Sequence, residues 1–161
     1  MKARFKAHTD GIRGIAFFPN GRSIISTSDD ASVRIWNLRD GSSKVMVITE
    51  RTSFFNSVAF SPDGRFIAAG SWDNSLWIWD SRRHKLVAKW RGRTAGVRSI
   101  VFTPDGKGLM SGSDDGVVNC WDMTSLGTGL EPQRVPDIRG FSGHKVGFFF
   151  HFGIFFFSHV D

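Results

Sequence analysis

The sequence has few of the residues that build disulfide-bonded, metal-binding or membrane-spanning structures. Its 161 residues include one cysteine, Cys120, so no disulfide can form within the chain, which fits a reducing compartment. Five histidines and this cysteine give no zinc-ligand spacing, so we expect no metal site. The longest apolar run, Phe148–Phe157, has ten residues, too few to cross a bilayer, and no signal peptide is recognisable. These absences predict a protein without membrane attachment.

Sequence motifs for catalysis and cofactor binding are absent as well. The chain has neither a G-x-x-x-x-G-K phosphate loop nor a G-x-G-x-x-G motif that follows a strand. His8 and Asp30 could serve as an acid–base pair, but their positions fit a structural role better. We therefore predict no enzyme activity and no cofactor.

The chain does contain a pattern that occurs three times. Residues 111–122 read SGSDDGVVNCWD, with an Asp-Gly turn, an apolar run and a final Trp-Asp, and related stretches occupy residues 26–37 and 69–80. Three sets of landmarks keep one spacing of 43 and then 42 residues: Gly21, Gly64 and Gly106; Pro19, Pro62 and Pro104; Trp36, Trp79 and Trp121. A period of 40–45 residues with Trp-Asp ends is typical of four-stranded propeller blades.

Each period predicts the same succession of strands and turns. A first strand alternates apolar residues, as in Ile15 and Phe17, and a Pro-Asn-Gly or Pro-Asp-Gly turn follows. Second strands are predicted at residues 23–27, 66–70 and 108–112, and outer strands at 44–49, 86–90 and 133–138. In the third period, Val117, Val118, Cys120 and Trp121 suit a strand that is buried on both faces.

The two ends of the chain depart from this pattern. Residues 3–5 resemble the outer strand of a preceding blade, and SGHK at residues 142–145 resembles the start of a following one. Residues 146–161 are rich in phenylalanine and lose the pattern. One interpretation is a membrane-seeking or aggregation-prone tail. We favour a translated intron, because valine codons begin with GT and a pyrimidine-rich tract encodes phenylalanine, and we expect a disordered or non-native tail.

These motifs together resemble those of WD40-repeat proteins over about residues 3–145. The resemblance implies an all-β fold, a partial β-propeller of three four-stranded blades at about residues 8–49, 51–91 and 93–139, with fragments of two neighbouring blades and a domain that ends at residue 145. Because ring closure is what protects blade edges, we expect a fragment of a larger gene product whose raw edges pair edge to edge.

The resemblance also implies a buried network that pins each blade. In the first blade it would join His8, Asp30 and Trp36 through the hydroxyl of Ser26 or Ser28, since a buried carboxylate needs hydrogen-bond partners. The second and third blades keep the equivalent acid and indole, which are Asp73 with Trp79 and Asp115 with Trp121. Arg51 and Arg93 stand at the histidine position there, so either an Arg–Asp pair replaces the His–Asp contact or the loops differ, and His144 would serve the following blade.

One face of such propellers is built by the start of each first strand and by the turn between the second and third strands. The residues there are Arg13, Asn56 and Arg98, then Ala31, Asn74 and Gly116, with Phe55 and Trp72 beside them. Polar, charged and aromatic groups together are typical of interaction hot spots. We expect a protein partner to contact Arg13, Asn56, Arg98, Phe55, Trp72 and Asn74; the alternative is ordinary solvation of loops.

Two further features have competing interpretations. Residues 81–98 carry seven Lys or Arg and no acid. Arg82–Arg98 could bind nucleic acid, but we favour a solvated outer strand and expect no direct nucleic-acid contact. Trp72, Trp77, Trp79 and Trp90 could form an aromatic cage, but the alternation of Trp77 and Trp79 favours packing between blades.

These inferences predict a non-catalytic protein-interaction scaffold. Within the WD40 family, the stretches at residues 32–41, 66–81 and 97–106 and the insertion that ends in SGHK resemble the fungal general transcriptional corepressor related to Groucho. That resemblance implies docking on DNA-bound repressors in the nucleus, with the cytoplasm as the alternative location. Another WD40 scaffold, such as a ubiquitin-ligase receptor or a signalling subunit, is the first alternative function, and nucleic-acid binding is the second.

Overall fold

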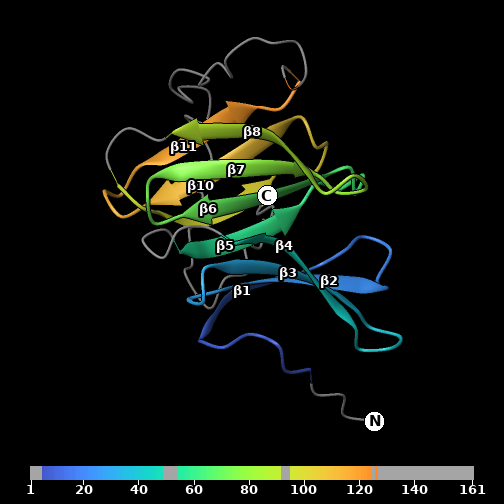
Figure 1. Cartoon of the computed structure of the whole chain (residues 1–161). Coiled ribbons are helices and arrows are strands. Elements are labelled where there is room, and N and C mark those ends of the chain that lie inside the picture. Colours follow the sequence, from blue (N-terminus) through green and yellow to red (C-terminus); the bar gives the residue numbers. More distant parts are fainter. Residues whose placement is uncertain (1–4, 49–53, 92–94, 125, 127–161) are drawn as a thin grey trace, which may run out of the picture.

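The computed structural model describes residues 5–48, 54–91, 95–124 and 126 of the chain. These residues form three antiparallel sheets and no helix, so the described part holds no helix that could cross a membrane. The first sheet contains β1 (Ile12–Phe17), β2 (Ser23–Ser28), β3 (Ser32–Asn37) and β4 (Ser43–Ile48); the second contains β5 (Phe55–Phe60), β6 (Phe66–Ser71), β7 (Ser75–Asp80) and β8 (Lys85–Arg91); the third contains β9 (Val97–Phe102), β10 (Gly108–Ser113) and β11 (Val118–Asp122). The strands of each sheet pair in chain order, which can be followed for β5 to β8 in Figure 1. The predicted all-β fold of consecutive blades is confirmed.

The turns within each sheet depend on residues that adopt positive φ. Gly21, Gly64 and Gly106 have φ of 68°, 69° and 71° and close the first hairpin of each sheet after the predicted prolines. Glycine takes this left-handed conformation without a Cβ penalty. The second hairpin of each sheet also turns at a residue with positive φ, but the residue type differs. These residues are Ala31, Asn74 and Gly116, at φ of 62°, 68° and 77°. The backbone of the repeat is therefore more constant than its sequence.

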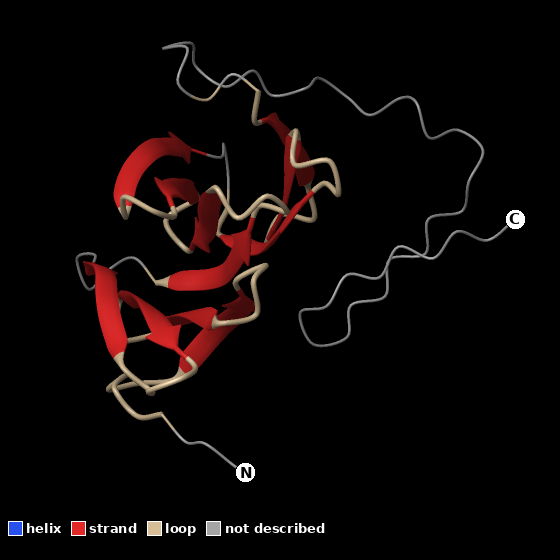
Figure 2. Ribbon diagram, turned by 90° about the vertical axis from the view of Figure 1, so that its right-hand side faces the viewer, coloured by secondary structure: helices blue, strands red, loops and turns tan. Residues whose placement is uncertain are grey.

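The sheets pack on one another through two buried clusters, and they lie side by side in Figure 2. Between the first two sheets, Ile25 and Val33 meet Val58, Ile67 and Trp79. Between the second and third sheets, the cluster includes Ala68, Leu76 and Ile78 with Ile100, Phe102, Leu109 and Trp121. Because side chains alternate between the two faces of a strand, the second sheet contributes to both clusters.

Some predictions fall outside the described residues or are corrected. The predicted outer strand at 133–138, the start of a further blade at 142, the boundary at 145 and the tail 146–161 lie outside, as do residues 3–4, and Phe5 is not in a strand. The predicted burial of Val117 and Val118 on both faces is wrong. Val117 precedes β11, and Val118 is 49% exposed because, among the described residues, no sheet packs on that side of β11.

Candidate interaction surface

The first sheet contains a hydrogen-bonded network around His8. The Nδ1 atom of His8 lies 2.9 Å from Oδ2 of Asp30, and its Nε2 atom lies 2.7 Å from Oγ of Ser26. Trp36 donates its indole N–H to the same Ser26 hydroxyl at 2.7 Å. Of the two candidate serines, Ser26 thus joins the histidine to the indole, whereas Ser28 accepts the Asp30 backbone N–H at 3.1 Å. The side chains of His8 and Asp30 are 3% and 8% exposed, which leaves little room for a substrate.

Asp30 is stabilised as a carboxylate within this network. Burial raises the pKa of Asp30, but the hydroxyl of Ser32 at 2.5 Å and the His8 ring outweigh it, together with the backbone N–H groups of Thr9 and Ser32. The net result is a pKa well below the ordinary value of an aspartate. A carboxylate held this way orders the turn between β2 and β3, which is a structural role.

The other two sheets keep parts of the network. In the second sheet, Asp73 accepts the backbone N–H of Ser75 at 3.1 Å and the Ser75 hydroxyl, and Lys89 Nζ lies 3.8 Å from its Oδ2 atom. Burial raises the pKa of Asp73, but these groups and the Ser71 hydroxyl together lower it. The position equivalent to Ser26 is Ala69 in this sheet. No sequence pattern predicts the contact of Lys89, which reaches Asp73 from the outer strand β8.

The third sheet keeps the indole bond and an aspartate turn. Trp121 donates its Nε1–H to Ser111 Oγ at 2.9 Å. Asp115 accepts the Ser113 hydroxyl at 2.5 Å and the Val117 backbone N–H at 3.1 Å. Arg51 and Arg93, at the histidine positions of the second and third blades, lie outside the described residues. The described part of the chain thus joins histidine, serine, aspartate and tryptophan in the first sheet alone.

The predicted interaction face is built on one turn geometry that all three sheets share. The first residue after each second strand donates its backbone N–H to a carbonyl that precedes the first strand. The pairs are Asp29 to Gly11 at 2.9 Å, Trp72 to Phe54 at 2.8 Å and Asp114 to Gly96 at 3.1 Å. Three equivalent backbone positions therefore present two carboxylates and one indole on the same face.

The first and third sheets use this position for an ion pair. Arg13 Nε lies 2.7 Å from Asp29 Oδ1, and Arg98 Nε lies 2.5 Å from Asp114 Oδ1. The hydrogen bond to Asp29 raises the pKa of Arg13 above its ordinary value. Asp29 and Asp114 were not predicted as part of this face; their signal is the first Asp of the Asp-Asp pair, sixteen residues after each arginine. We name the four residues the two Arg–Asp pairs.

The second sheet differs, because Asn56 replaces the arginine and Trp72 replaces the aspartate. Asn56 donates its side-chain amide to the Val97 carbonyl at 2.9 Å, across to the third sheet. Trp72 is 55% exposed. A Cβ on Gly96 would lie 3.1 Å from the Trp72 carbonyl oxygen and 3.2 Å from Asp114 Oδ2, so the Trp72 backbone and the Asp114 carboxylate lie on either side of Gly96. The face thus carries an exposed indole beside charged groups.

Several predicted contact residues are corrected by their burial. Phe55 is wrong as a contact residue, because its ring is fully buried against Trp77 and Trp79 at centroid distances of 5.7 and 5.9 Å. Ala31 is also buried, and Asn74 is half-buried in its turn. Packing between blades is found for Trp79 and for Trp90, which stacks on Trp121 at 5.5 Å. That interpretation is wrong for Trp72, which is exposed.

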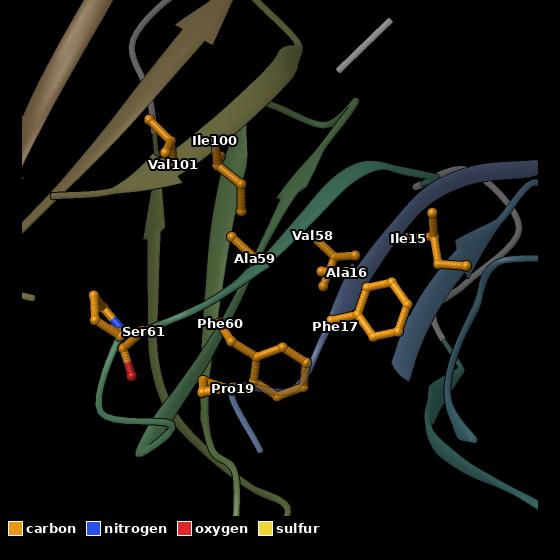
Figure 3. Close-up of a pocket in the computed structure, with 11 residues that line it drawn as sticks. Ile15, Ala16, Phe17, Pro19, Val58, Ala59, Phe60, Ser61, Ile100 and Val101 are labelled. Carbon is orange, nitrogen blue, oxygen red and sulfur yellow. The ribbon is translucent and has the colours of Figure 1, made fainter. Parts of the chain in front are cut away.

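The inner strands of the three sheets line a shallow apolar cleft. Its volume is about 400 Å³, and β1, β5 and β9 all contribute to its walls. Figure 3 shows Phe17 and Phe60 along the cleft, with Ile15 farther out on the first sheet and Ile100 on the third. No charged side chain lines this cleft. Its lining is mostly apolar, and Ser61 adds a hydroxyl.

The described basic residues of the stretch 81–98 lie in the turn before β8, along β8 and on β9. The Arg82 and Arg83 backbone N–H groups donate to Asp80 in the turn before β8, and Arg98 pairs with Asp114 on β9. Lys89 lies 4.0 Å from the centre of the Trp77 ring. The cations are thus spread along the blade and partly neutralised. Within the described ranges no group of three His, Cys, Asp or Glu residues could hold a metal ion.

Known proteins contain repeats that are similar to those of this chain. The family model for the WD domain, G-beta repeat, matches residues 1–37, 42–80 and 84–122. The 26S proteasome regulatory subunit RPN14 of Saccharomyces cerevisiae is 38% identical over 48 residues, which are 30% of this chain and 12% of that protein. A striatin homolog of Dictyostelium discoideum is 47% identical over 38 residues, 24% of this chain and 5% of that protein.

Solved structures show the same fold. The crystal structure of RRP9 WD40 repeats matches with a TM-score of 0.70 at 22% identity and covers 76% of this chain and 38% of that one. The structure of U3-55K matches with a TM-score of 0.71 at 22% identity, covering 76% and 39%. This chain therefore spans well under half the length of these relatives. The second and third matched repeats each combine the outer strand of one sheet with the three inner strands of the next, and the first contains β1, β2 and β3.

Proposed function

Since this chain belongs to the WD40 family of G-beta repeat proteins, we propose that it is a non-catalytic scaffold that binds protein partners through the face that carries Trp72. The observation that carries the proposal is the replacement of one Arg–Asp pair by an exposed indole on an unchanged turn. Tryptophan and arginine are the residues most enriched in interface hot spots. Trp72 would be the anchor, and the two Arg–Asp pairs would form a polar rim around it.

The role of the rim follows from its exposure. The side chains of Arg13 and Arg98 are about half exposed and already paired, so each adds little stability to the free protein. Exposed charges of this kind set association rate and orientation more than affinity. The affinity is thus assigned to Trp72 and the orientation to the arginines.

Within this function we propose, more narrowly, a corepressor that docks on DNA-bound regulators in the nucleus. Its support is the similarity of residues 32–41, 66–81 and 97–106 to the Groucho-related corepressor. The names of the matched relatives refer to other assemblies, a proteasome regulatory subunit and a striatin homolog among them. A ubiquitin-ligase receptor or signalling scaffold, in the cytoplasm or nucleus, is the competing assignment within the same class.

The test compares protein capture by three forms of the full chain. The wild type, Trp72→Ala and the matched control Leu86→Ala, which alters an exposed apolar residue on β8, are used as bait under identical conditions. Proteins that bind the proposed face are retained by the wild type and by Leu86→Ala but lost with Trp72→Ala. A capture profile that Trp72→Ala leaves unchanged contradicts the proposal. Repressors or other DNA-bound regulators among the lost proteins would support the corepressor role; ligase or signalling subunits would reject it.

A separate measurement addresses nucleic acid. Binding of the full chain to duplex DNA is measured at two salt concentrations. Phosphate contacts release counterions, so real binding weakens as salt rises. We expect no binding at either concentration, because the cations of residues 82–98 are spread along the blade. A steep salt dependence that Arg82→Gln reduces would favour nucleic-acid binding instead.

A further inference from the structure

The outward side of β1 exposes apolar side chains whose equivalents in the third sheet are buried. We call Ile12, Ile15 and Phe17 the leading face. Ile15 is 62% exposed, whereas its equivalent two periods later, Ile100, is 5% exposed. Phe17 is 68% exposed against 6% for Phe102. The same residue types stand at the same places in the repeat, so the difference is in what packs on them.

The opposite end of the described chain has a complementary surface on the third sheet. We call Val101, Met110, Val118 and Cys120 the trailing face. Their equivalents in the second sheet, one period earlier, are Ala59, Ala68, Leu76 and Ile78, which pack in or against the cluster with the third sheet. Val118 is 49% exposed, whereas Leu76 is 0% exposed. Among the described residues, no further sheet packs on the trailing face.

The two faces are the two halves of one interface that the chain already forms twice. In each buried cluster, leading-face positions of one sheet meet trailing-face positions of the sheet before it. Phe55 and Val58 meet Ile25 and Val33 in the first cluster, and Ile100 and Phe102 meet Ala68 and Leu76 in the second. The exposed faces are apolar, and none of their residues is charged. Each face is therefore equivalent to a surface that, elsewhere in the chain, is buried against a surface of the other kind.

We propose that two copies of this chain bind head to tail, with the leading face of each copy on the trailing face of the other. Because every copy has one face of each kind, two reciprocal contacts close the assembly with two-fold symmetry. The three described sheets of each copy would together make a ring of six, and propellers of four to eight blades are known to close. The contact continues the interface between sheets that is already present within the chain.

This arrangement replaces the edge-to-edge pairing expected from sequence. The outer strands are poor pairing edges, because the register shifts between Val33 and Arg34 on β3 and between Ile78 and Trp79 on β7 leave an extra residue in β4 and β8. Bulges and exposed lysines disfavour strand addition at an edge. Strand β8 carries Lys85 and Lys89 along this edge. The apolar surface lies on the faces instead.

The test is the mass of the full chain in sedimentation velocity over a range of micromolar concentrations. The wild type is expected at twice the chain mass of 18.0 kDa. Phe17→Glu and Val118→Lys each place a charge in every interface, and either variant alone should weaken dimerisation roughly 100-fold or more. Both positions are exposed in one copy, so neither change disturbs the fold, which circular dichroism checks.

A mixture of the two variants distinguishes this geometry from others. When Phe17→Glu is mixed with Val118→Lys, one of the two interfaces is unaltered on both sides, so dimers should return. The matched control Leu86→Glu places the same charge on the exposed side of β8 and should leave the dimer intact. A wild-type monomer, which would mean that another segment of the chain covers the faces, overturns the proposal. So do open-ended oligomers, a dimer that Phe17→Glu leaves intact, or one that Leu86→Glu dissociates.

Discussion

The indole Nε1 of Trp36 on β3 donates a hydrogen bond to the Ser26 hydroxyl on the neighbouring strand β2, at 2.7 Å. The same hydroxyl lies 2.7 Å from Nε2 of His8, and Ser26 is almost completely buried. The Ser26 hydroxyl is thus a hydrogen-bond partner of two larger side chains. Its removal would leave both the indole N–H and the imidazole without this partner. Buried polar groups that lose their partners are costly.

We predict that Ser26→Ala lowers the free energy of unfolding by about 1–3 kcal/mol. The measurement is urea denaturation at pH 7, followed by circular dichroism. Ser42→Ala, which removes an exposed hydroxyl that bonds to Asp40, is the control and should change stability by less than about 0.5 kcal/mol. Equal effects for the two variants would show that the network adds nothing beyond a surface hydroxyl.

The choice between Ser26 and Ser28 illustrates what sequence alone left open. Residues two apart on a strand share a face, so the period of 2 gives both serines the same predicted environment. The structure separates them because His8 and Trp36 converge on Ser26, while Ser28 lies beside the turn and accepts the Asp30 N–H. Convergence of segments eighteen residues apart is a tertiary fact that no local pattern contains.

The fold was more predictable than the face. Landmarks such as Pro62, Gly64 and Trp79 recur because turns and buried strands demand them in every blade, so the period alone predicts the sheets. No comparable structural requirement determines which residues occupy the interaction face. Phe55 and Trp72 are both aromatic and flank the same turn region, yet one is fully buried and the other is exposed. Their difference depends on which side of the chain the neighbouring sheet occupies.

The Asp30 carboxylate makes the stability of the first sheet depend on pH. Its folded-state pKa lies below the unfolded value of about 4. The unfolded chain therefore takes up the proton first as the pH falls, so the stabilisation is complete above about pH 4 and declines below it. We predict that Asp30→Asn destabilises the protein at pH 7 and that the difference from wild type shrinks by pH 3.

The measurement is the urea midpoint of both proteins at pH 7, 5 and 3. Other aspartates, such as Asp63 and Asp105, also have lowered pKa values, through the hydroxyls of Ser61 and Thr103 first. Both proteins therefore lose stability in acid, and the informative quantity is the difference between them. A difference that stays constant from pH 7 to pH 3 would mean that the Asp30 charge is not what stabilises the turn.

The contact of Trp90 with Trp121 couples the second and third sheets. Trp90 lies on β8 and is buried, and the two rings stack at 5.5 Å with an interplanar angle of 19°. We predict that Trp90→Ala lowers the free energy of unfolding by about 3–5 kcal/mol, because it opens a cavity in the cluster between these sheets. Leu86→Ala on the same strand is the exposed control, with an expected loss near 0.5 kcal/mol. Similar losses in urea denaturation would place Trp90 outside the core.

Gly70 on β6 is a point where the second sheet approaches the third too closely for a side chain. A Cβ at this position would meet a Val97 methyl, Cγ1, at 2.4 Å and Ile100 Cγ2 at 3.2 Å. One period later the equivalent residue is Gly112 on β10, where a Cβ would meet nothing within 4 Å. The same substitution at two equivalent positions therefore separates the effect of packing from the backbone effect of replacing glycine.

We predict that Gly70→Ala destabilises the protein by about 1–3 kcal/mol, because Val97 must move within a buried cluster. Gly112→Ala should be neutral or stabilising by up to about 1 kcal/mol, because alanine restricts the unfolded chain and fits this strand without contact. Urea denaturation of both variants at pH 7 measures the difference. If the two substitutions had the same effect, the second and third sheets would not be held in the close contact that Gly70 permits. Opposite signs at positions one period apart would show that the interface between blades, and not strand propensity, requires this glycine.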